Sequence, residues 1–316
     1  MLSYRHAFHA GNSADVLKHC VLVYCLDYLG RKEKPFFVVD THAGAGQYTL
    51  KIQEKQKAGV CREPGREWES GIGRLLDAAG RPKAAAAGLP LLRRYLEALS
   101  AAACGGAGGT DGGARGMDAG GKTGEGVSRY AGSPALIRTL LGKQDRAALF
   151  ELHPADFAAL AEGFGGDRRF TARREDGLAG LRALLPPPQR RGCVFIDPSY
   201  ELREDYGAVR DGLRGALRRF AAGLYIVWYP LLAGTDKPEK PGHEFAAGLL
   251  SLYPGNRCLV ELRTGPVPER GMYGSGLVIF NPPWTLKGAL EESMDGLAAL
   301  LSGGRGDWGL KWEGRR

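Results

Sequence analysis

Four consecutive residues in the second half of the chain, Asp197, Pro198, Ser199 and Tyr200, are of types that could hold a nucleobase. They follow the apolar run 193–196, which is typical of a buried parallel strand. The Asp197 carboxylate and the Pro198 carbonyl can accept hydrogen bonds from an exocyclic amino group, while the Tyr200 ring stacks on the attached base. The segment therefore predicts a site for an adenine or a cytosine taken out of its stack. A strand that ends in a proline turn is the alternative interpretation.

A glycine-rich segment earlier in the chain could bind a nucleotide-like ligand. Residues 40–46 (DTHAGAG) directly follow the apolar run 36–39, and glycine lets the backbone pass close to a ligand. The full dinucleotide fingerprint G-x-G-x-x-G is absent because Thr49 occupies its last position. A ligand without a pyrophosphate, such as S-adenosylmethionine, therefore fits better, with a purely structural turn as the alternative.

Two further acidic positions follow the next two predicted strands. Glu151 ends the second strand, where an acid can accept hydrogen bonds from ribose hydroxyls. Asp176 and Gly177 follow the third strand, where they could contact the adenine of a bound nucleoside. Acids in exposed loops would produce the same pattern.

The N-terminal region interleaves aromatic and basic side chains, a pattern that suits stacking on RNA or DNA bases and contact with phosphates. These residues are Tyr4, Arg5, His6, Phe8, His9, Lys18 and His19. A solvated arm is the alternative. His6 and His9 have no further ligands at a recognisable metal-binding spacing, so we expect no metal site.

The elements that position these residues alternate between strands and helices. A helix over 15–29, capped by Asn12 or Ser13, precedes the first strand. The further predicted strands are 147–150, 170–173, 193–196, 224–228, 257–262 and 276–280. The pattern predicts an α/β fold with a doubly wound, mostly parallel sheet of seven strands and a helical insertion after strand one.

Four segments follow from this pattern. Residues 1–50 would contain an RNA-contacting arm, a helix and the first strand with its loop, and residues 51–129 the helical insertion. Within the insertion, 11 of the 23 residues in 104–126 are glycine, so we expect this loop to be disordered. Residues 130–302 would complete the domain, followed by a peripheral tail, 303–316.

Composition limits the classes of function. The net charge of +8 and a pI near 9.2 favour a polyanionic partner such as nucleic acid. The six cysteines include no C-x-x-C pair, which predicts reduced thiols rather than a disulfide framework or a zinc site. Neither a leader nor an apolar run of about 18 residues is visible, so we expect a cytoplasmic protein without a membrane span.

With these residues identified, the chain resembles the 23S ribosomal RNA adenine-N6-methyltransferases of the RlmJ type. The most specific matches are MLSYRHAFHAGNSADVLKH at 1–19 and DTHAGAG at 40–46. The others are 132–134, 151–154, 176–177, 190–200, 228–230 and 276–284. Two positions depart from the family: Ser199 replaces the second proline of the catalytic motif, and Ser13 replaces a histidine.

This resemblance implies a Rossmann-like class I methyltransferase that uses S-adenosylmethionine to methylate one adenine of 23S rRNA, protein-free or in an early assembly intermediate. It implies that Asp197 is the catalytic acid, and we expect the enzyme to be a monomer. The residues it assigns to the cofactor pocket are His19, His42, Ser133, Glu151, Asp176, Gly177 and Asp197. It assigns Tyr4 to the RNA substrate, in addition to Pro198 and Tyr200, which their residue types assign to the target base.

A second segment, Asn281-Pro282-Pro283-Trp284, competes with Asp197 for the catalytic role. By its letters it is the better match to the (D/N/S)-P-P-(Y/F/W) motif of amino-methyltransferases. The adenine-binding turn should follow the fourth strand, beside the strand with the glycine-rich loop, whereas Asn281 follows the seventh. We therefore predict that Asp197 is the functional acid and that 281–284 is structural.

Three other functions are compatible with parts of the pattern. A DNA adenine methyltransferase would use the same motifs, and a protein that binds nucleic acid without catalysis could retain the fold with Ser199 in the altered motif. A nicotinamide-dependent oxidoreductase is the weakest of the three because the glycine fingerprint is incomplete.

Overall fold

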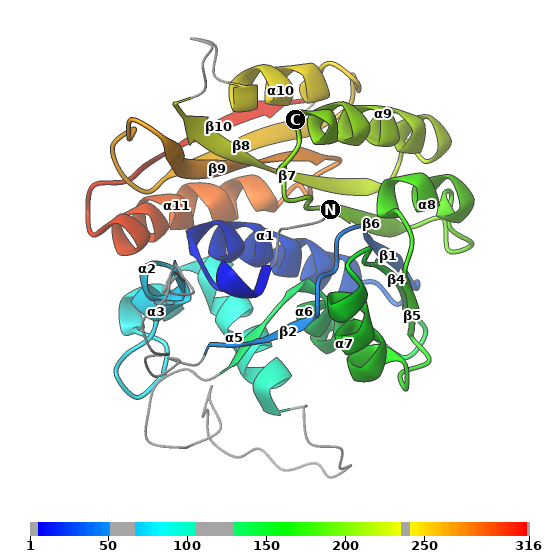
Figure 1. Ribbon diagram of the computed structural model, residues 1–316, viewed down its shortest axis with the longest axis horizontal. Helices are drawn as coiled ribbons and strands as arrows, with labels where there is room; N and C mark the ends of the chain where they lie inside the picture. Colours follow the sequence, from blue (N-terminus) through cyan, green and yellow to red (C-terminus); the bar gives the residue numbers. More distant parts are fainter. Residues whose placement is uncertain (1–5, 51–66, 105–128, 235–240, 315–316) are drawn as a thin grey trace, which may run out of the picture.

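The computed structural model describes residues 6–50, 67–104, 129–234 and 241–314 (Figure 1). Its centre is a sheet of eight strands in the order β10-β8-β9-β7-β6-β1-β4-β5. The strands are β1 Phe37–Asp40, β4 Arg146–Phe150, β5 Phe170–Arg173, β6 Gly192–Ile196, β7 Leu224–Ala233, β8 Arg257–Arg263, β9 Gly271–Phe280 and β10 Asp307–Glu313.

The sheet confirms the predicted α/β fold and contains all seven predicted strands. Strands β5, β4, β1, β6 and β7 are parallel, so their carboxyl ends share one edge. Strand β9 is inserted between β7 and β8 and is antiparallel to both. The side of the sheet that can hold a ligand is therefore the carboxyl edge of the parallel strands.

The eighth strand corrects the predicted strand count and the expectation of a peripheral tail. Strand β10 lies within 303–316 and pairs antiparallel with β8 over its whole length. Its side chains Trp308, Leu310 and Trp312 alternate with small and charged residues and pack against the core. This period of two is a strand signal that the sequence prediction did not use.

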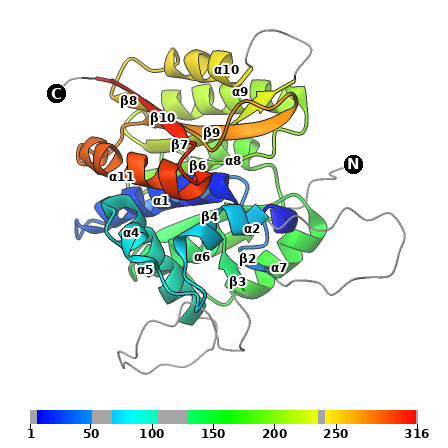
Figure 2. The same cartoon turned by 90° about the vertical axis from the view of Figure 1, so that its left-hand side faces the viewer.

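The helices of the described residues cover both faces of the sheet. They are α1 Ser13–Gly30, α2 Glu67–Ser70, α3 Ile72–Leu75, α4 Ala84–Ala87, α5 Pro90–Cys104, α6 Ser133–Leu140, α7 Pro154–Phe164, α8 Gly177–Leu184, α9 Arg203–Arg219, α10 Pro241–Leu250 and α11 Leu286–Ser302, with a short 3-10 helix, η1, at His6–Phe8. Figure 2 shows α9 and α10 on one face and α1 and α11 on the other, with α5 and α6 beyond α1. None of these helices is both long enough and apolar enough to cross a membrane.

The predicted helical insertion after the first strand is confirmed. Between β1 and β4 lie α2 to α6 and a two-stranded antiparallel ribbon of β2 Gln47–Thr49 and β3 Arg129–Ala131. The glycine-rich stretch 104–126, which we expected to be disordered, lies outside the described residues apart from Cys104. The insertion packs on α1 through α5 and α6, so it shares a core with the sheet domain.

Helix α1 lies between the sheet and the insertion and is buried on nearly all sides. Apolar side chains occupy most of its circumference, as expected of a helix covered by protein all round. Asn12 caps its amino end as predicted, because the Asn12 side-chain oxygen accepts a hydrogen bond from the Asp15 N–H at 2.9 Å. Its side-chain nitrogen also donates to Glu67 of α2.

We expect Asn12→Ala to lower the free energy of unfolding by about 1 kcal/mol, because the first turn of α1 loses its cap. Guanidinium denaturation followed by circular dichroism measures this difference. Ser70→Ala, at an exposed position, is the matched control and should change stability by less than about 0.5 kcal/mol. Equal stability of the Asn12 and Ser70 variants would show that the cap contributes nothing.

Candidate active site

A cavity of about 450 Å³ opens at the carboxyl edge of the parallel strands. This volume is within the usual range for small-molecule sites. The described residues assigned to the cofactor pocket, to catalysis or to the target base all line the cavity, and they come from α1, the strand ends and the loops that follow them. They are His19, His42, Ser133, Glu151, Asp176, Gly177, Asp197, Pro198 and Tyr200. Phe8 of the N-terminal pattern does not line the cavity. Tyr4 lies outside the described residues, and the roles of all ten stay predictions.

The competing motif 281–284 is at the opposite edge of the sheet. Because β9 is antiparallel to β7, its last residue, Phe280, pairs with Tyr225 near the start of β7. Asn281 then donates hydrogen bonds from its side chain to the carbonyls of Ala221 and Gly223. Asn281 therefore stabilises a turn, as the structural interpretation predicts, and it is not among the residues that line the cavity.

The glycine-rich loop after β1 holds Glu151 against the cavity. Gly44 has a positive φ of 59°, and its N–H donates to Glu151 Oε2 at 2.9 Å. The N–H of His153 donates to Glu151 Oε1 at 2.7 Å. Burial raises the pKa of the Glu151 carboxyl, while these two donors oppose the shift. The carboxylate is fixed where it can accept hydrogen bonds from ligand hydroxyls.

Asp176 and Gly177 begin α8 next to the end of β1. The Asp176 carboxylate caps α8 by accepting hydrogen bonds from the N–H groups of Leu178 and Ala179. A Cβ atom at Gly177 would lie 2.3 Å from the carbonyl oxygen of Thr41. Glycine is therefore required for α8 to approach this closely, which brings Asp176 to the cavity.

A buried ion-pair network lies beneath the cavity. Lys18 Nζ is 2.7 Å from Asp197 Oδ2 and 2.7 Å from Asp15 Oδ1. Asp15 Oδ2 also accepts hydrogen bonds from the Gly11 N–H and from His6 Nε2, at 2.7 and 3.0 Å. Lys18 is therefore an ion-pair partner of Asp197, for which the sequence predicts the catalytic role. Lys18 and its neighbour His19 are both buried, which corrects their grouping with the N-terminal residues suited to RNA contact and excludes the alternative of a solvated arm for these two residues.

These contacts decide the charge of the carboxyls. Burial raises the pKa of Asp197, and the Lys18 ammonium opposes that rise. Burial also acts to raise the pKa of Asp15, but His6 and Lys18 outweigh it and hold that pKa well below its usual range. The network therefore favours an ionised acceptor at Asp197.

The sequence prediction missed a second buried acid, Asp40, although it ends β1 directly before the glycine-rich loop. Its carboxylate accepts a hydrogen bond of 2.6 Å from the Ser133 hydroxyl. Burial raises the pKa of Asp40 to about 7, and the nearby Asp197 charge adds to the shift. Since the Ser133 proton points to Asp40, the serine offers its oxygen lone pairs to the cavity.

Tyr200 lies in an aromatic cluster at the cavity mouth. Its hydroxyl donates to the Trp228 carbonyl at 2.7 Å, and its ring centroid is 4.5 Å from that of Tyr206. Phe245 packs edge-on against it. The cluster fixes the Tyr200 ring. Because the residue is 7% exposed, a small part of it remains open to a ligand.

The site contains no arrangement typical of a metal centre. Among the described residues, no group of three or more His, Cys, Asp or Glu side chains could hold a metal ion. The four cysteines described as free thiols, Cys20, Cys25, Cys193 and Cys258, are buried. The side chains that line the cavity include carboxylates, imidazoles, the Lys18 ammonium and the Ser133 hydroxyl.

Comparison with known proteins shows similarity over nearly the whole chain. A model of the family described as "Ribosomal RNA large subunit methyltransferase D, RlmJ" matches residues 33–102 and 118–314. Proteins named "Ribosomal RNA large subunit methyltransferase J" from Haemophilus influenzae and Escherichia coli are 39% and 34% identical, each alignment covering 99% of both chains. A crystal structure of the Legionella pneumophila protein LPL1258 has a TM-score of 0.76 at 29% identity, over 96% of this chain and 98% of that one.

We expect Lys18→Met to lower the free energy of unfolding by about 3–5 kcal/mol at pH 8, because Asp15 and Asp197 lose their buried cation. The deficit should shrink at pH 5.5. In the variant the pKa of Asp197 rises further above its unfolded value, so the folded state binds more protons than the unfolded state, and stability increases as pH falls.

Guanidinium denaturation at the two pH values measures this change, with the exposed Lys143→Met as control. A deficit that does not depend on pH would mean that the carboxyls are not held ionised by Lys18.

Proposed function

Because this chain belongs to the RlmJ family of ribosomal RNA large subunit methyltransferases, we propose that it transfers a methyl group from S-adenosylmethionine to the N6 amine of one adenine in 23S rRNA. The family resemblance read from the sequence is thereby confirmed. The class I methyltransferase fold agrees with it, with eight strands in the sheet where seven were predicted.

The observation that carries the proposal is that Asp197 and Pro198 open into the same cavity as the glycine-rich loop and Glu151. An amine donor held by the first pair is therefore close to a ligand held by the second. Neither motif alone would specify a transfer reaction, since each occurs as an ordinary turn.

The residues of the cavity fit S-adenosylmethionine, which supplies an electrophilic methyl group when bound. Glu151 is fixed to accept hydrogen bonds from the ribose hydroxyls, and Asp176 with Gly177 would border the adenine. Gly44 has a positive φ, and a Cβ atom there would meet the Tyr48 hydroxyl at 2.0 Å, so this turn of the loop is suited to glycine. His19, His42 and Ser133 complete the cofactor pocket.

The target amine of adenine is a poor nucleophile because its lone pair is delocalised into the ring. The Asp197 carboxylate and the Pro198 carbonyl accept hydrogen bonds from its two N–H groups, which favours a tetrahedral nitrogen with its lone pair directed at the methyl donor. Asp197 then accepts the hydrogen bond or the proton that the product nitrogen gives up. Lys18 opposes the rise in the pKa of Asp197 that burial causes, and so favours the ionised form that this role needs.

The polyanionic substrate agrees with the net charge of +8. We place Tyr4 against the RNA and the Tyr200 ring against the flipped adenine, with protein-free rRNA or an early assembly intermediate as substrate. The enzyme acts as a cytoplasmic monomer in this proposal.

The proposal predicts that labelled methyl from S-adenosylmethionine enters N6-methyladenosine of protein-free large-subunit rRNA, with little label in DNA or small-subunit rRNA. Digestion to nucleosides identifies the product. Asp197→Asn should reduce the rate on the order of 100-fold, because the carboxylate acceptor is lost. The exposed Asp211→Asn should match the parent.

Other outcomes of this assay favour other functions. Preference for protein-free DNA would make the chain a DNA methyltransferase. Bound cofactor without any transfer would favour the non-catalytic interpretation and implicate Ser199. Near-normal transfer by the Asp197→Asn variant would remove Asp197 from the catalytic role.

For Tyr200 we expect a leucine substitution to weaken RNA binding by about 1–3 kcal/mol through lost stacking, while leaving cofactor binding intact. Tyr200→Phe keeps the ring and loses only the hydrogen bond to Trp228, so it should bind RNA like the parent. Fluorescence anisotropy with a labelled rRNA fragment measures both. If the leucine variant binds as well as the phenylalanine variant, Tyr200 is not the stacking residue.

A further inference from the structure

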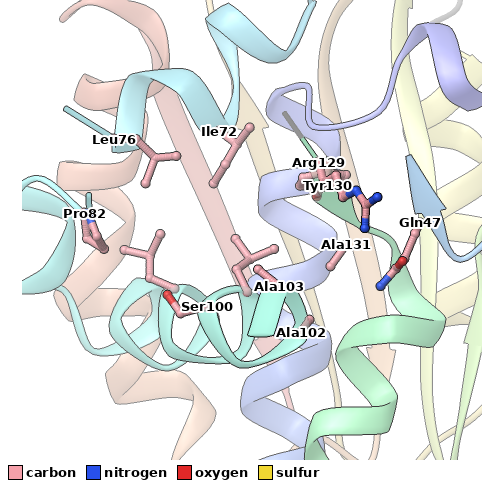
Figure 3. Close-up of a pocket in the computed structure, with 12 residues that line it drawn as sticks. Gln47, Ile72, Leu76, Pro82, Ser100, Ala102, Ala103, Arg129, Tyr130 and Ala131 are labelled. Atoms are coloured by element: carbon pink, nitrogen blue, oxygen red, sulfur yellow. The ribbon is translucent and has the colours of Figure 1, made fainter. Parts of the chain in front are cut away.

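A chain of three buried side chains connects the helical insertion to the cofactor pocket. His19 Nδ1 is 2.7 Å from the Tyr130 hydroxyl, which is 3.0 Å from the Tyr95 hydroxyl. His19 is on α1, Tyr130 on β3 and Tyr95 on α5, and each is at most 2% exposed. Figure 3 shows Tyr130 at a small cavity inside the insertion, next to residues of α3 and α5.

The direction of the two hydrogen bonds follows from the number of protons. Each tyrosine hydroxyl carries one proton, and a neutral histidine carries one on either ring nitrogen. In the described part of the chain, Tyr95 has no hydrogen-bond partner other than Tyr130. If His19 Nδ1 donated to Tyr130, one of the two tyrosine protons would be buried without an acceptor, which is costly. Every proton is satisfied only when Tyr95 donates to Tyr130 and Tyr130 donates to Nδ1.

This direction fixes the tautomer of His19. Burial lowers the pKa of His19 to about 3, so the ring is neutral at physiological pH and carries a single proton. With Nδ1 as an acceptor, that proton resides on Nε2. His19 lines the ligand cavity and Tyr130 does not, so Nδ1 points away from the cavity and Nε2 is the nitrogen available to a ligand.

We propose that Tyr130 is a positioning residue, which donates to His19 Nδ1 and so makes His19 present an Nε2–H donor to the carboxylate of the bound S-adenosylmethionine. The carboxylates of Glu151, Asp176 and Asp197 supply hydrogen-bond acceptors to the same cavity, and these suit donor groups of the cofactor. The Nε2–H of His19 is a donor and requires an acceptor on the cofactor, of which the carboxylate is the strongest. The inference rests on the proposed function for the identity of the cofactor. Tyr95 contributes to the same arrangement, because its hydroxyl donates a hydrogen bond to the Tyr130 oxygen.

The first test is the tautomer itself, measured by long-range 1H–15N correlation NMR on protein labelled at the histidine ring nitrogens. The His19→Gln variant assigns the signal by its disappearance. The proposal expects an unprotonated Nδ1 and a protonated Nε2 in the parent protein, with no titration between pH 8 and 5. A protonated Nδ1 would overturn it. This experiment requires neither RNA nor turnover, so it succeeds or fails independently of the proposed methyl transfer.

The second test removes only the Tyr130 hydroxyl. In Tyr130→Phe, His19 Nδ1 loses its donor, so its resonance should move downfield. Binding of S-adenosylhomocysteine should weaken about three- to tenfold, the range expected for one hydrogen bond. Tyr225→Phe is the matched control, because Tyr225 is equally buried and donates to the Ala216 and Phe220 carbonyls on the far side of the sheet.

A ligand without the carboxylate separates positioning from packing. 5′-Deoxy-5′-methylthioadenosine keeps the nucleoside and lacks the amino-acid end, so its affinity should be equal in the parent and in Tyr130→Phe. Calorimetry measures both ligands. An equal loss for both ligands would mean that Tyr130 supports only the packing of the pocket. Unchanged affinity for S-adenosylhomocysteine, with unchanged His19 resonances, would show that Tyr130 has no role.

Discussion

The ion pair of Lys18 with Asp15 and Asp197 is the interaction on which the active site depends. Asp15 and Lys18 are buried, and the Asp197 side chain is 11% exposed at the cavity. A buried carboxylate without a cation would take up a proton or destabilise the fold. Asp197 follows β6, whereas Lys18 and Asp15 belong to α1, so the pair fixes the helix against the end of the strand. The same contact that holds the helix against the strand favours the ionised form of the Asp197 carboxylate by opposing the rise in its pKa.

The direction of the strands decides which of two similar motifs can act. Asp197 ends a parallel strand and opens into the cavity, whereas Asn281 ends the antiparallel strand β9 and lies at the other edge of the sheet. Each segment contains a residue with a positive φ of 52°, Tyr200 in one and Asn281 in the other, so the presence of such a residue does not distinguish the two turns. Topology does, because only the carboxyl edge of the parallel strands gathers the other ligand-binding loops.

The insertion after β1 is part of the active site rather than an attachment to it. Its β3 and α5 supply Tyr130 and Tyr95, which contact His19 on the buried side of α1. Ser133 at the start of α6 faces the cavity, held by Asp40. Helix α1 is therefore supported by the sheet on one side and by the insertion on the other, and its polar residues are fixed from both.

The sequence by itself determined the alternation of strands and helices, the helical insertion and the segments that meet at the carboxyl edge. These features are local: apolar runs, the Asn12 cap, and acids or glycines placed directly after strands. The alternation of Trp308, Leu310 and Trp312 also indicates strand β10, although the sequence prediction treated the tail as peripheral. Only the tertiary structure showed that Lys18 is buried against Asp197 and that Asp40 accepts a hydrogen bond from Ser133. It also showed that Tyr130 is hydrogen-bonded to His19 across a separation of 111 residues in the chain. Such partners are set by how helices and strands pack, and a side chain's charge or hydrogen-bonding state follows from that packing rather than from its neighbours along the chain.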